Sequence, residues 1–184
     1  ASAPAAIVVS VAQDDLSLRD GDIGWNKFLA ADDGFEAVAC DPQTHLNILF
    51  SSGTTGDPKA IPWTHVSPIK CVADAFYMHD VRPGEILAWP TNLGWMMGPW
   101  LIFAALVNRA SMAIFDGAPT GRDFGRFVQD AGVTMLGVVP SLVNTWRASQ
   151  CMENLDWSRI RRFSSTGECS NADDMHYLMS LAGG

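Results

Sequence analysis

Residues 51–59 hold the residue types in this sequence that are best suited to chemistry: two glycines, four hydroxyl side chains and a lysine. Glycine lets a backbone turn tightly and bring its N–H groups close to a ligand. Hydroxyl and ammonium groups donate hydrogen bonds to phosphate oxygens. The apolar run at 46–50 precedes this loop and is typical of a strand. The pattern indicates a phosphate-binding loop, with a polar surface turn as the alternative. The candidate ligand-binding residues are Ser51, Ser52, Gly53, Thr54, Thr55, Gly56 and Lys59.

The loop differs from the Walker A loop, in which Gly-Lys-Ser/Thr places the lysine at the start of a helix. Here Pro58 precedes Lys59 and Ala60 follows it. Asp57 also disfavours a rigid wrap around a polyanion. We therefore expect a mobile loop that closes over a pyrophosphate group and reopens.

Composition excludes several classes of function. The formal net charge of −8 argues against nucleic-acid binding, which needs a basic surface to neutralise phosphates. The longest strongly apolar stretch, 93–107, is shorter than the roughly 20 residues that a membrane span needs. Seven Trp and nine Phe predict a packed core instead of a disordered chain.

The cysteines give no sign of a metal centre. No C-x-x-C pair is present, and no histidine lies at ligand spacing, so we expect no metal site in this chain. Free, buried thiols in a reducing compartment are the expected state of Cys40, Cys71, Cys151 and Cys169.

Short apolar runs alternate with helical patterns and predict an α/β fold with a mostly parallel sheet and flanking helices. The expected strands are 6–11, 46–50, 60–63, 85–89, 111–115, 134–139 and 162–165. The expected helices are 25–29, 67–79, 95–107, 124–131, 141–149 and a last one after Ser170. In parallel sheets ligands bind beyond the carboxyl ends of strands, and both polar clusters of this chain, 51–59 and 165–168, follow strands.

Helix ends and buried faces can be predicted in more detail. Ser141 is expected to cap one helix, and Ser170 with Asp173 to form a capping box for the last. The helix at 95–107 is apolar on every side, as a buried helix is. The inner face of the last helix is expected to hold Met175, Leu178, Met179 and Ala182. Core packing is expected of Trp25, Trp63, Trp89, Trp100, Trp146 and Trp157.

The string at 51–59 resembles the signature loop of the AMP-forming acyl-CoA synthetases, an adenylate-forming superfamily that includes luciferase and peptide-synthetase adenylation domains. Asn92-Leu93-Gly94-Trp95 and Ser165-Thr166-Gly167-Glu168 are similar to two further segments of that family. The combination at 163–168 is most similar to the acetyl-CoA-synthetase-like branch, which includes plant peroxisomal acyl-activating enzymes. The resemblance extends from Trp25 to the end of the sequence.

This resemblance implies that Thr54, Thr55, Gly56 and Lys59 hold the β- and γ-phosphates of ATP. Gly167 and Glu168 would line the adenine and ribose side of the nucleotide. The implied reaction joins a small-molecule carboxylate to AMP and then to the thiol of coenzyme A, with ATP and Mg²⁺, and no side chain of this chain acts as a covalent nucleophile. An acyl pocket is implied at Trp95, Met96, Met97 and Thr166, with plain core packing as the alternative for each.

The resemblance also implies that residues 1–184 are part of the large N-terminal AMP-binding domain. The family's later segments, which bind Mg²⁺ and ribose and carry the adenylation lysine, do not occur in this sequence. We therefore expect little activity from these residues alone. Two alternatives stay open: a non-catalytic nucleotide- or phosphate-binding module, and an adenylation domain that passes its acyl group to another acceptor. The expected location is intracellular, in the cytoplasm or the peroxisome.

Overall fold

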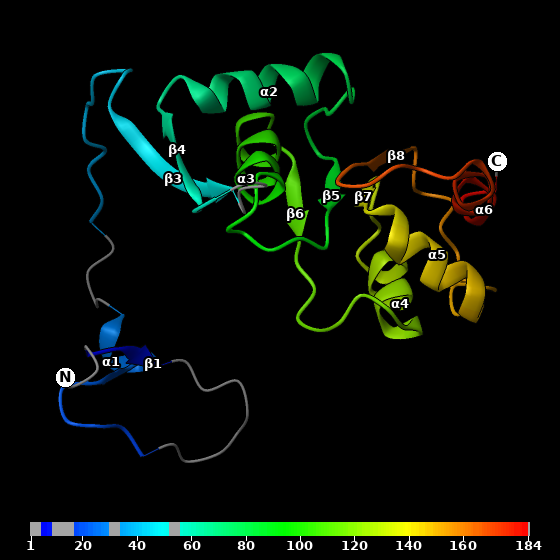
Figure 1. The fold of residues 1–184 in the computed structure, drawn as a ribbon, viewed down its shortest axis with the longest axis horizontal. Helices are drawn as coiled ribbons and strands as arrows, with labels where there is room; N and C mark the ends of the chain where they lie inside the picture. The colour runs from blue at the N-terminus through cyan, green and yellow to red at the C-terminus, as the bar shows by residue number, and fades with distance from the viewer. Residues whose placement is uncertain (1–4, 9–16, 30–33, 52–55, 184) are drawn as a thin grey trace. The chain divides into compact units, whose positions relative to one another are not determined.

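The computed structural model describes residues 5–8, 17–29, 34–51 and 56–183. Backbone contacts divide the chain into two units, Ala1–Ala39 and Cys40–Gly184. Figure 1 shows the elements of both, and each unit is described by itself.

In its described residues, the first unit contains two short strands and one short helix. Strand β1 (Ile7–Val8) pairs in parallel with β2 (Ile23–Gly24), and the short helix α1 (Trp25–Phe28) follows. The Asp22 carboxylate accepts a hydrogen bond of 2.9 Å from the backbone N–H of Ala6. The hydrogen bond from Arg19 holds the pKa of Asp22 at about 2.

Two expectations about this unit were wrong. The buried strand expected at 6–11 is a two-residue strand whose Ile7 is 49% exposed, and residues 9–11 lie outside the described residues. Trp25, expected in a core, is exposed. Neither described strand is long enough to offer an apolar face that would cover these side chains.

The second unit contains a parallel four-stranded sheet, which confirms the predicted α/β class. Its strands are β5 (Ile86–Ala88), β6 (Ser111–Ala113), β7 (Met135–Val138) and β8 (Arg162–Ser165). They lie in the order β6-β5-β7-β8, and every neighbouring pair is parallel. The helices are α2 (Ser67–Tyr77), α3 (Met97–Val107), α4 (Arg122–Asp130), α5 (Pro140–Ser149) and α6 (Ala172–Leu181).

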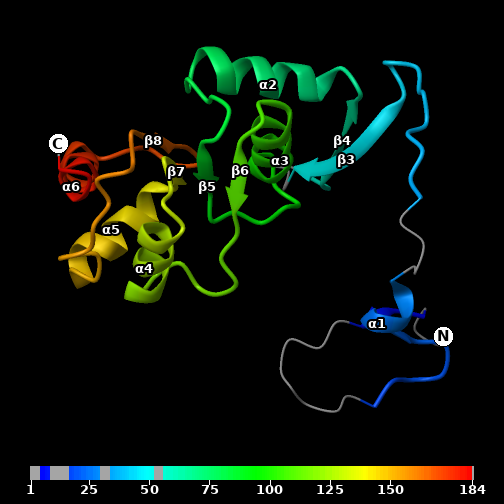
Figure 2. The same cartoon turned by 180° about the vertical axis from the view of Figure 1, so that it is seen from behind.

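Helices cover both faces of this sheet, as Figure 1 and the reverse view in Figure 2 show. Ala75 of α2 and Trp100 of α3 belong to one buried core. Phe124 of α4, Trp146 of α5 and Leu178 of α6 belong to another. A strand covered by helices on both faces needs apolar side chains on both faces, so its sequence is an unbroken run of apolar residues.

The two central strands supply both cores by alternation. Leu87 of β5 and Met135 of β7 belong to the core with α2 and α3. Their neighbours Ala88 and Leu136 belong to the core with α4, α5 and α6. Successive strand side chains point to opposite faces of a sheet, so two or three residues suffice to join each strand to both layers.

A separate antiparallel hairpin carries the predicted phosphate loop. Strand β3 (His45–Ser51) pairs with β4 (Lys59–Thr64), and Ser51 lies opposite Lys59. Both strands were predicted, but the sequence placed the loop at the end of a strand in a parallel sheet. In the structure the loop joins two strands of a two-stranded sheet of its own.

Several predicted helix ends were wrong. Helix α5 begins at Pro140 with Val139 as its cap, so Ser141 lies inside the first turn. Helix α6 is capped by Asn171, whose side chain accepts from the backbone N–H of Asp173 at 2.8 Å, and Ser170 is not the cap. Pro at the first helical position needs no hydrogen-bond acceptor for its nitrogen, and Asn is as good a cap as Ser.

Predicted burial also needs correction. Leu106 and Val107 of α3 are exposed, so this helix is not buried on every side. Met179 of α6 is exposed, and the buried polar residue on that helix is Asp174, which pairs with Arg147 of α5 at 2.6 Å. Cys71 is buried and Cys151 half-buried, but two of the cysteines expected to be buried, Cys40 and Cys169, are exposed.

The amino-terminal edge of the sheet is held by buried charge. Glu85 precedes β5 and is 3% exposed, and its carboxylate pairs with Arg161 and Arg162 at the start of β8. A buried carboxylate is tolerated only when it is paired in this way. This pairing joins the starts of two strands that β7 separates.

A close contact between Trp89 and Gly137 fixes the carboxyl-terminal edge. A methyl group at Gly137 in β7 would overlap the indole ring of Trp89, which follows β5. Trp89 also packs edge-on against Trp100 of α3, with ring centroids 5.5 Å apart. Glycine at 137 therefore makes room for the indole against the sheet.

We predict that Gly137→Ala lowers the free energy of unfolding by about 2 kcal/mol, because the added methyl group must displace a buried indole. Urea denaturation followed by far-UV circular dichroism measures this change. Gly56→Ala is the matched control, since no atom of the described residues lies within 4 Å of its added methyl group. Equal stabilities of the two variants would contradict the role assigned to Gly137.

Candidate functional site

The strand order places β5 and β7 side by side, and the chain leaves these two strands toward opposite sides of the sheet. From β5 the chain passes through α3 to β6, and from β7 it passes through α5 to β8 on the other side of the sheet. Ligands in open α/β sheets bind in the crevice beyond the carboxyl ends of such strands. In this protein the segments at that edge are 89–96 after β5, 139–141 after β7 and 166–168 after β8.

The segment after β8 forms a turn whose base is held by two contacts. The backbone N–H of Thr166 donates to the carbonyl of Val138 at 3.3 Å. The hydroxyl groups of Ser165 and Ser170 lie 3.1 Å apart and close the base of the turn. Gly167 has a φ of +91°, a conformation that side chains other than glycine rarely adopt. Of these turn residues, Thr166 is half-buried and Gly167 is exposed.

Glu168 completes this turn by reaching back to α5. Its carboxylate accepts hydrogen bonds of 2.9 Å from both the backbone N–H and the hydroxyl of Ser141. Ser141 is separated from it by 27 positions in sequence. The sequence named Ser141 only as a helix cap, and no local signal reveals Glu168 as its partner.

The segment after β5 is also folded tightly. The Asn92 side chain accepts from the backbone N–H of Gly94 at 2.8 Å, and its carbonyl accepts from the N–H of Trp95 at 3.0 Å. Gly98, at the start of α3, lies against the backbone of Leu93 without room for a side chain. This tight turn places Trp95 at the surface, where it is 72% exposed. Met96 is also exposed.

Only part of the predicted phosphate loop lies in the described residues. Ser51 is half-buried, and Gly56 and Lys59 are exposed. Ser52, Gly53, Thr54 and Thr55 lie outside the described residues. The strand that follows the loop leads to Trp63, which shares a cavity with Met96, so the structure brings this hairpin close to the segment after β5.

That shared cavity, of about 370 Å³, lies between β4, α2 and α3. Its polar side is formed by Lys70 and Asp74 of α2, which pair at 2.9 Å. The hydrogen bond from Lys70 holds the pKa of Asp74 below its usual value. Burial raises the pKa of the Cys71 thiol in its wall, so this cysteine is not an activated nucleophile.

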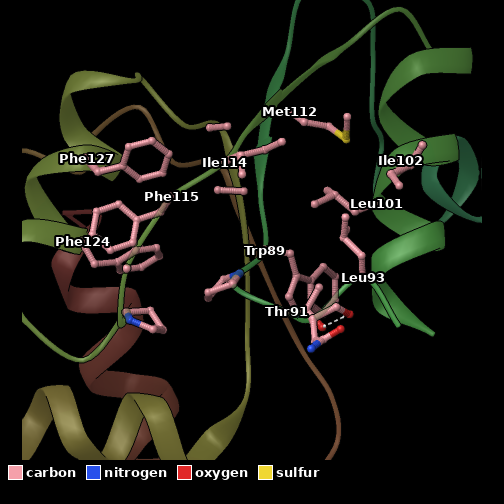
Figure 3. A pocket seen from close by; sticks show the side chains of 16 residues that line it. Trp89, Thr91, Leu93, Leu101, Ile102, Met112, Ile114, Phe115, Phe124 and Phe127 are labelled. Atoms are coloured by element: carbon pink, nitrogen blue, oxygen red, sulfur yellow. Dashed lines mark hydrogen bonds between the residues drawn. The ribbon is translucent and has the colours of Figure 1, made fainter. Parts of the chain in front are cut away.

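A larger apolar cavity of about 550 Å³ lies at the carboxyl ends of β5 and β6. Figure 3 shows Leu101 and Ile102 of α3 on one side and the rings of Phe115, Phe124 and Phe127 on the other. The three ring centroids lie 5.2 to 6.2 Å apart, so the aromatic wall is packed against itself. No charged side chain lines this cavity among the described residues. Such a space accepts a carbon chain and excludes an ion.

Sequence reasoning missed this cavity. Phe124 and Phe127 were recognised as one face of a helix, but nothing local shows that this face meets the end of β6 and the side of α3. None of the residues expected at the acyl pocket (Trp95, Met96, Met97 and Thr166) lines the larger cavity. Met97 instead packs half-buried against the core of α2 and α3.

Within the described ranges, no three His, Cys, Asp or Glu side chains are grouped so that they would hold a metal ion. A search of the same residues finds no helix with the length and apolar character that crossing a membrane requires.

We predict that Trp95→Ala changes the free energy of unfolding by less than about 0.5 kcal/mol, because the indole is largely in water. Trp100→Ala, five residues along the chain and only 5% exposed, should cost about 3–5 kcal/mol. Chemical denaturation of both variants checks this. A loss above about 2 kcal/mol for Trp95→Ala would show that Trp95 serves packing instead of ligand binding.

Known proteins with similar sequences and structures identify the family of this chain. The chain is 52% identical over 189 residues to "Probable acyl-activating enzyme 17, peroxisomal" of Arabidopsis thaliana and 50% identical to "Hexanoyl-CoA synthase" of Cannabis sativa. Each alignment covers 99% of this chain and 26% of the relative, so the chain spans about a quarter of the length of these curated relatives.

Among solved structures, "Acetoacetyl-CoA Synthetase from Streptomyces lividans" superposes with a TM-score of 0.80 at 26% identity, covering 98% of this chain and 28% of the other. The family model described as "AMP-binding enzyme" matches residues 2–184. The loop at 51–59, the segment after β5 and the turn after β8 all lie within the matched residues, and this chain belongs to the AMP-binding enzymes.

Proposed function

We propose that this protein is an AMP-forming acyl-CoA ligase, and that residues 1–184 are part of its N-terminal AMP-binding domain. The observation that carries the proposal is that the segments 89–96 and 166–168 both follow strands at the carboxyl-terminal edge of one parallel sheet, in a chain of the AMP-binding family. The similarity to a hexanoyl-CoA synthase and to an acetoacetyl-CoA synthetase supports coenzyme A as the final acyl acceptor.

The proposed reaction has two steps. A carboxylate oxygen of the substrate attacks the α-phosphorus of ATP, and pyrophosphate leaves to give an acyl-adenylate. The sulfur of coenzyme A then attacks the acyl carbon, its proton is lost, and AMP leaves. Both steps depend on positioning anions and neutralising their charge, so hydroxyl groups, backbone N–H groups and a lysine are suitable tools.

The roles of the site residues follow from their chemistry. Ser51, Ser52, Gly53, Thr54, Thr55, Gly56 and Lys59 would hold the phosphates that leave as pyrophosphate. Gly167 and Glu168 would lie on the adenine and ribose side. Mg²⁺ would neutralise the phosphates and be held mainly by their oxygens, since a hard cation prefers oxygen ligands and keeps several waters.

The acyl group would lie between Thr166 and the segment of Trp95, Met96 and Met97. We propose that the apolar cavity beside this segment takes the end of an aliphatic chain. Its volume of about 550 Å³ falls within the range of roughly 300–1,000 Å³ common for ligand pockets. The polar side chains of its described lining, Thr91 and Asn92, come from the segment that leads to Trp95.

Two alternative functions would give different results in binding and activity measurements. A non-catalytic nucleotide-binding module would bind ATP but show no dependence on a carboxylate. An adenylation domain serving another acceptor would form the acyl-adenylate in the complete protein but leave coenzyme A unchanged. The name of the Arabidopsis relative supports the peroxisome as the site of action, with the cytoplasm as the alternative.

We predict that Lys59→Ala weakens ATP binding by this chain about tenfold, since a charge-assisted hydrogen bond to phosphate is lost. Lys70→Ala removes the same charge from α2, where the ammonium group pairs with Asp74, and should leave ATP affinity unchanged. Isothermal titration calorimetry of both variants with ATP measures this. Equal losses would show a general charge effect, and no ATP binding by the unsubstituted chain would contradict the proposed role of the loop.

The apolar cavity gives a second prediction, based on a series of unbranched carboxylates from butanoate to octanoate. Each added methylene should strengthen binding about fourfold, because burying one contributes about 0.8 kcal/mol. Ile102→Trp fills the cavity and should remove this dependence on chain length. Leu106→Trp places the same ring on the exposed face of the same helix and should preserve it. Competition against a fluorescent fatty-acid probe measures these affinities, and an unaltered series in Ile102→Trp would exclude the cavity.

A further inference from the structure

The pairing of Glu168 with Ser141 has a consequence for the nucleotide site. Each oxygen of the Glu168 carboxylate accepts a 2.9 Å hydrogen bond, one from the Ser141 hydroxyl and one from its backbone N–H. The carboxylate is thereby directed toward the first turn of α5 and away from the exposed face of the 166–168 turn. A carboxylate held in this way orients the backbone on which it stands.

We infer that Ser141 is a positioning residue, which acts through Glu168 to hold the Thr166–Glu168 backbone in the shape that receives the nucleotide. This inference rests on the proposed nucleotide-binding role of the turn. In this inference the Glu168 side chain stabilises the turn and does not bind the nucleotide. The backbone groups beside it contact the ligand.

Independent features of the turn support this assignment. Gly167 has a φ of +91°. Because glycine has no side chain, its backbone rotates freely unless neighbouring contacts restrain it. On one side the restraint is the hydrogen bond from Thr166 to Val138 of β7. On the other side it is the pair of hydrogen bonds between Glu168 and Ser141 at the start of α5. Without the second restraint the turn is held at its base alone.

The charge of Glu168 also favours one end of a nucleotide over the other. The first turn of a helix carries partial positive charge and attracts anions. Here that position is already occupied by a carboxylate of the chain itself. A phosphate group would be repelled from this corner, so the uncharged base and ribose fit it better, and the phosphates are left to the loop at 51–59.

Calorimetry with AMP tests the inference in the 184-residue chain. Ser141→Ala should weaken AMP binding by about threefold to tenfold, as expected for loss of one charge-assisted hydrogen bond. Ser141→Thr keeps the hydroxyl group and should restore the affinity. Ser149→Ala is the matched control, since it removes a hydroxyl group from the last turn of the same helix, where it bonds to Thr145.

A double substitution separates this role from direct contact between Ser141 and the ligand. If Ser141 acts through Glu168, adding Ser141→Ala to Glu168→Ala should cause no further loss. Additive losses, or no loss in Ser141→Ala, would overturn the inference. No AMP binding by the unsubstituted chain would instead overturn the proposed function.

A measurement without ligand completes the test. The backbone order parameter of Gly167, from ¹⁵N relaxation, should fall in Ser141→Ala and in Glu168→Ala but not in Ser149→Ala. Melting temperatures of all variants should stay close to that of the unsubstituted chain, because both residues are exposed. An unchanged order parameter at Gly167 would show that Ser141 does not position the turn.

Discussion

Strands β5 and β7 lie side by side and parallel, although two helices and a third strand separate them along the chain. Leu87 pairs with Met135 and Ala88 with Leu136, so each strand contributes side chains to both cores. Because β6 lies on the far side of β5 and β8 on the far side of β7, the chain must leave these two neighbours in opposite directions. This strand order places a crevice at the carboxyl ends of β5 and β7. Every candidate binding segment after the parallel strands depends on it.

The two edges of the sheet have opposite character. At the amino-terminal edge the buried Glu85 carboxylate is paired with Arg161 and Arg162, which joins the start of β5 to the start of β8. At the carboxyl-terminal edge the contacts are a tryptophan on a glycine and hydrogen bonds between loops. Buried ion pairs hold position well because separating them leaves an uncompensated charge. The loops at the other edge are instead held by single hydrogen bonds, such as the one from Thr166 to Val138.

The hairpin of β3 and β4 adds the part of the site that the parallel sheet does not contain. A loop between antiparallel strands can change conformation without moving a core strand, which suits the proposed role of binding and releasing a charged leaving group. The side chain of Trp63 in β4 lines a cavity together with Met96. The hairpin and the segment after β5 therefore share a wall, although their binding residues have different chemistry.

The sequence by itself determined what is local: the residue types of the loop at 51–59, the alternation of short strands with helices, and the resemblance to the AMP-binding family. These depend on neighbouring residues, whose types and spacing are directly visible. The tertiary structure alone decided the antiparallel pairing of β3 with β4, the exposure of Met179 in place of Asp174, and the contact of Ser141 with Glu168. It also decided the apolar cavity, whose walls come from both sides of the sheet. In each of these cases the outcome depends on a partner many positions away, and residue type and spacing do not encode which distant groups the strand order brings together.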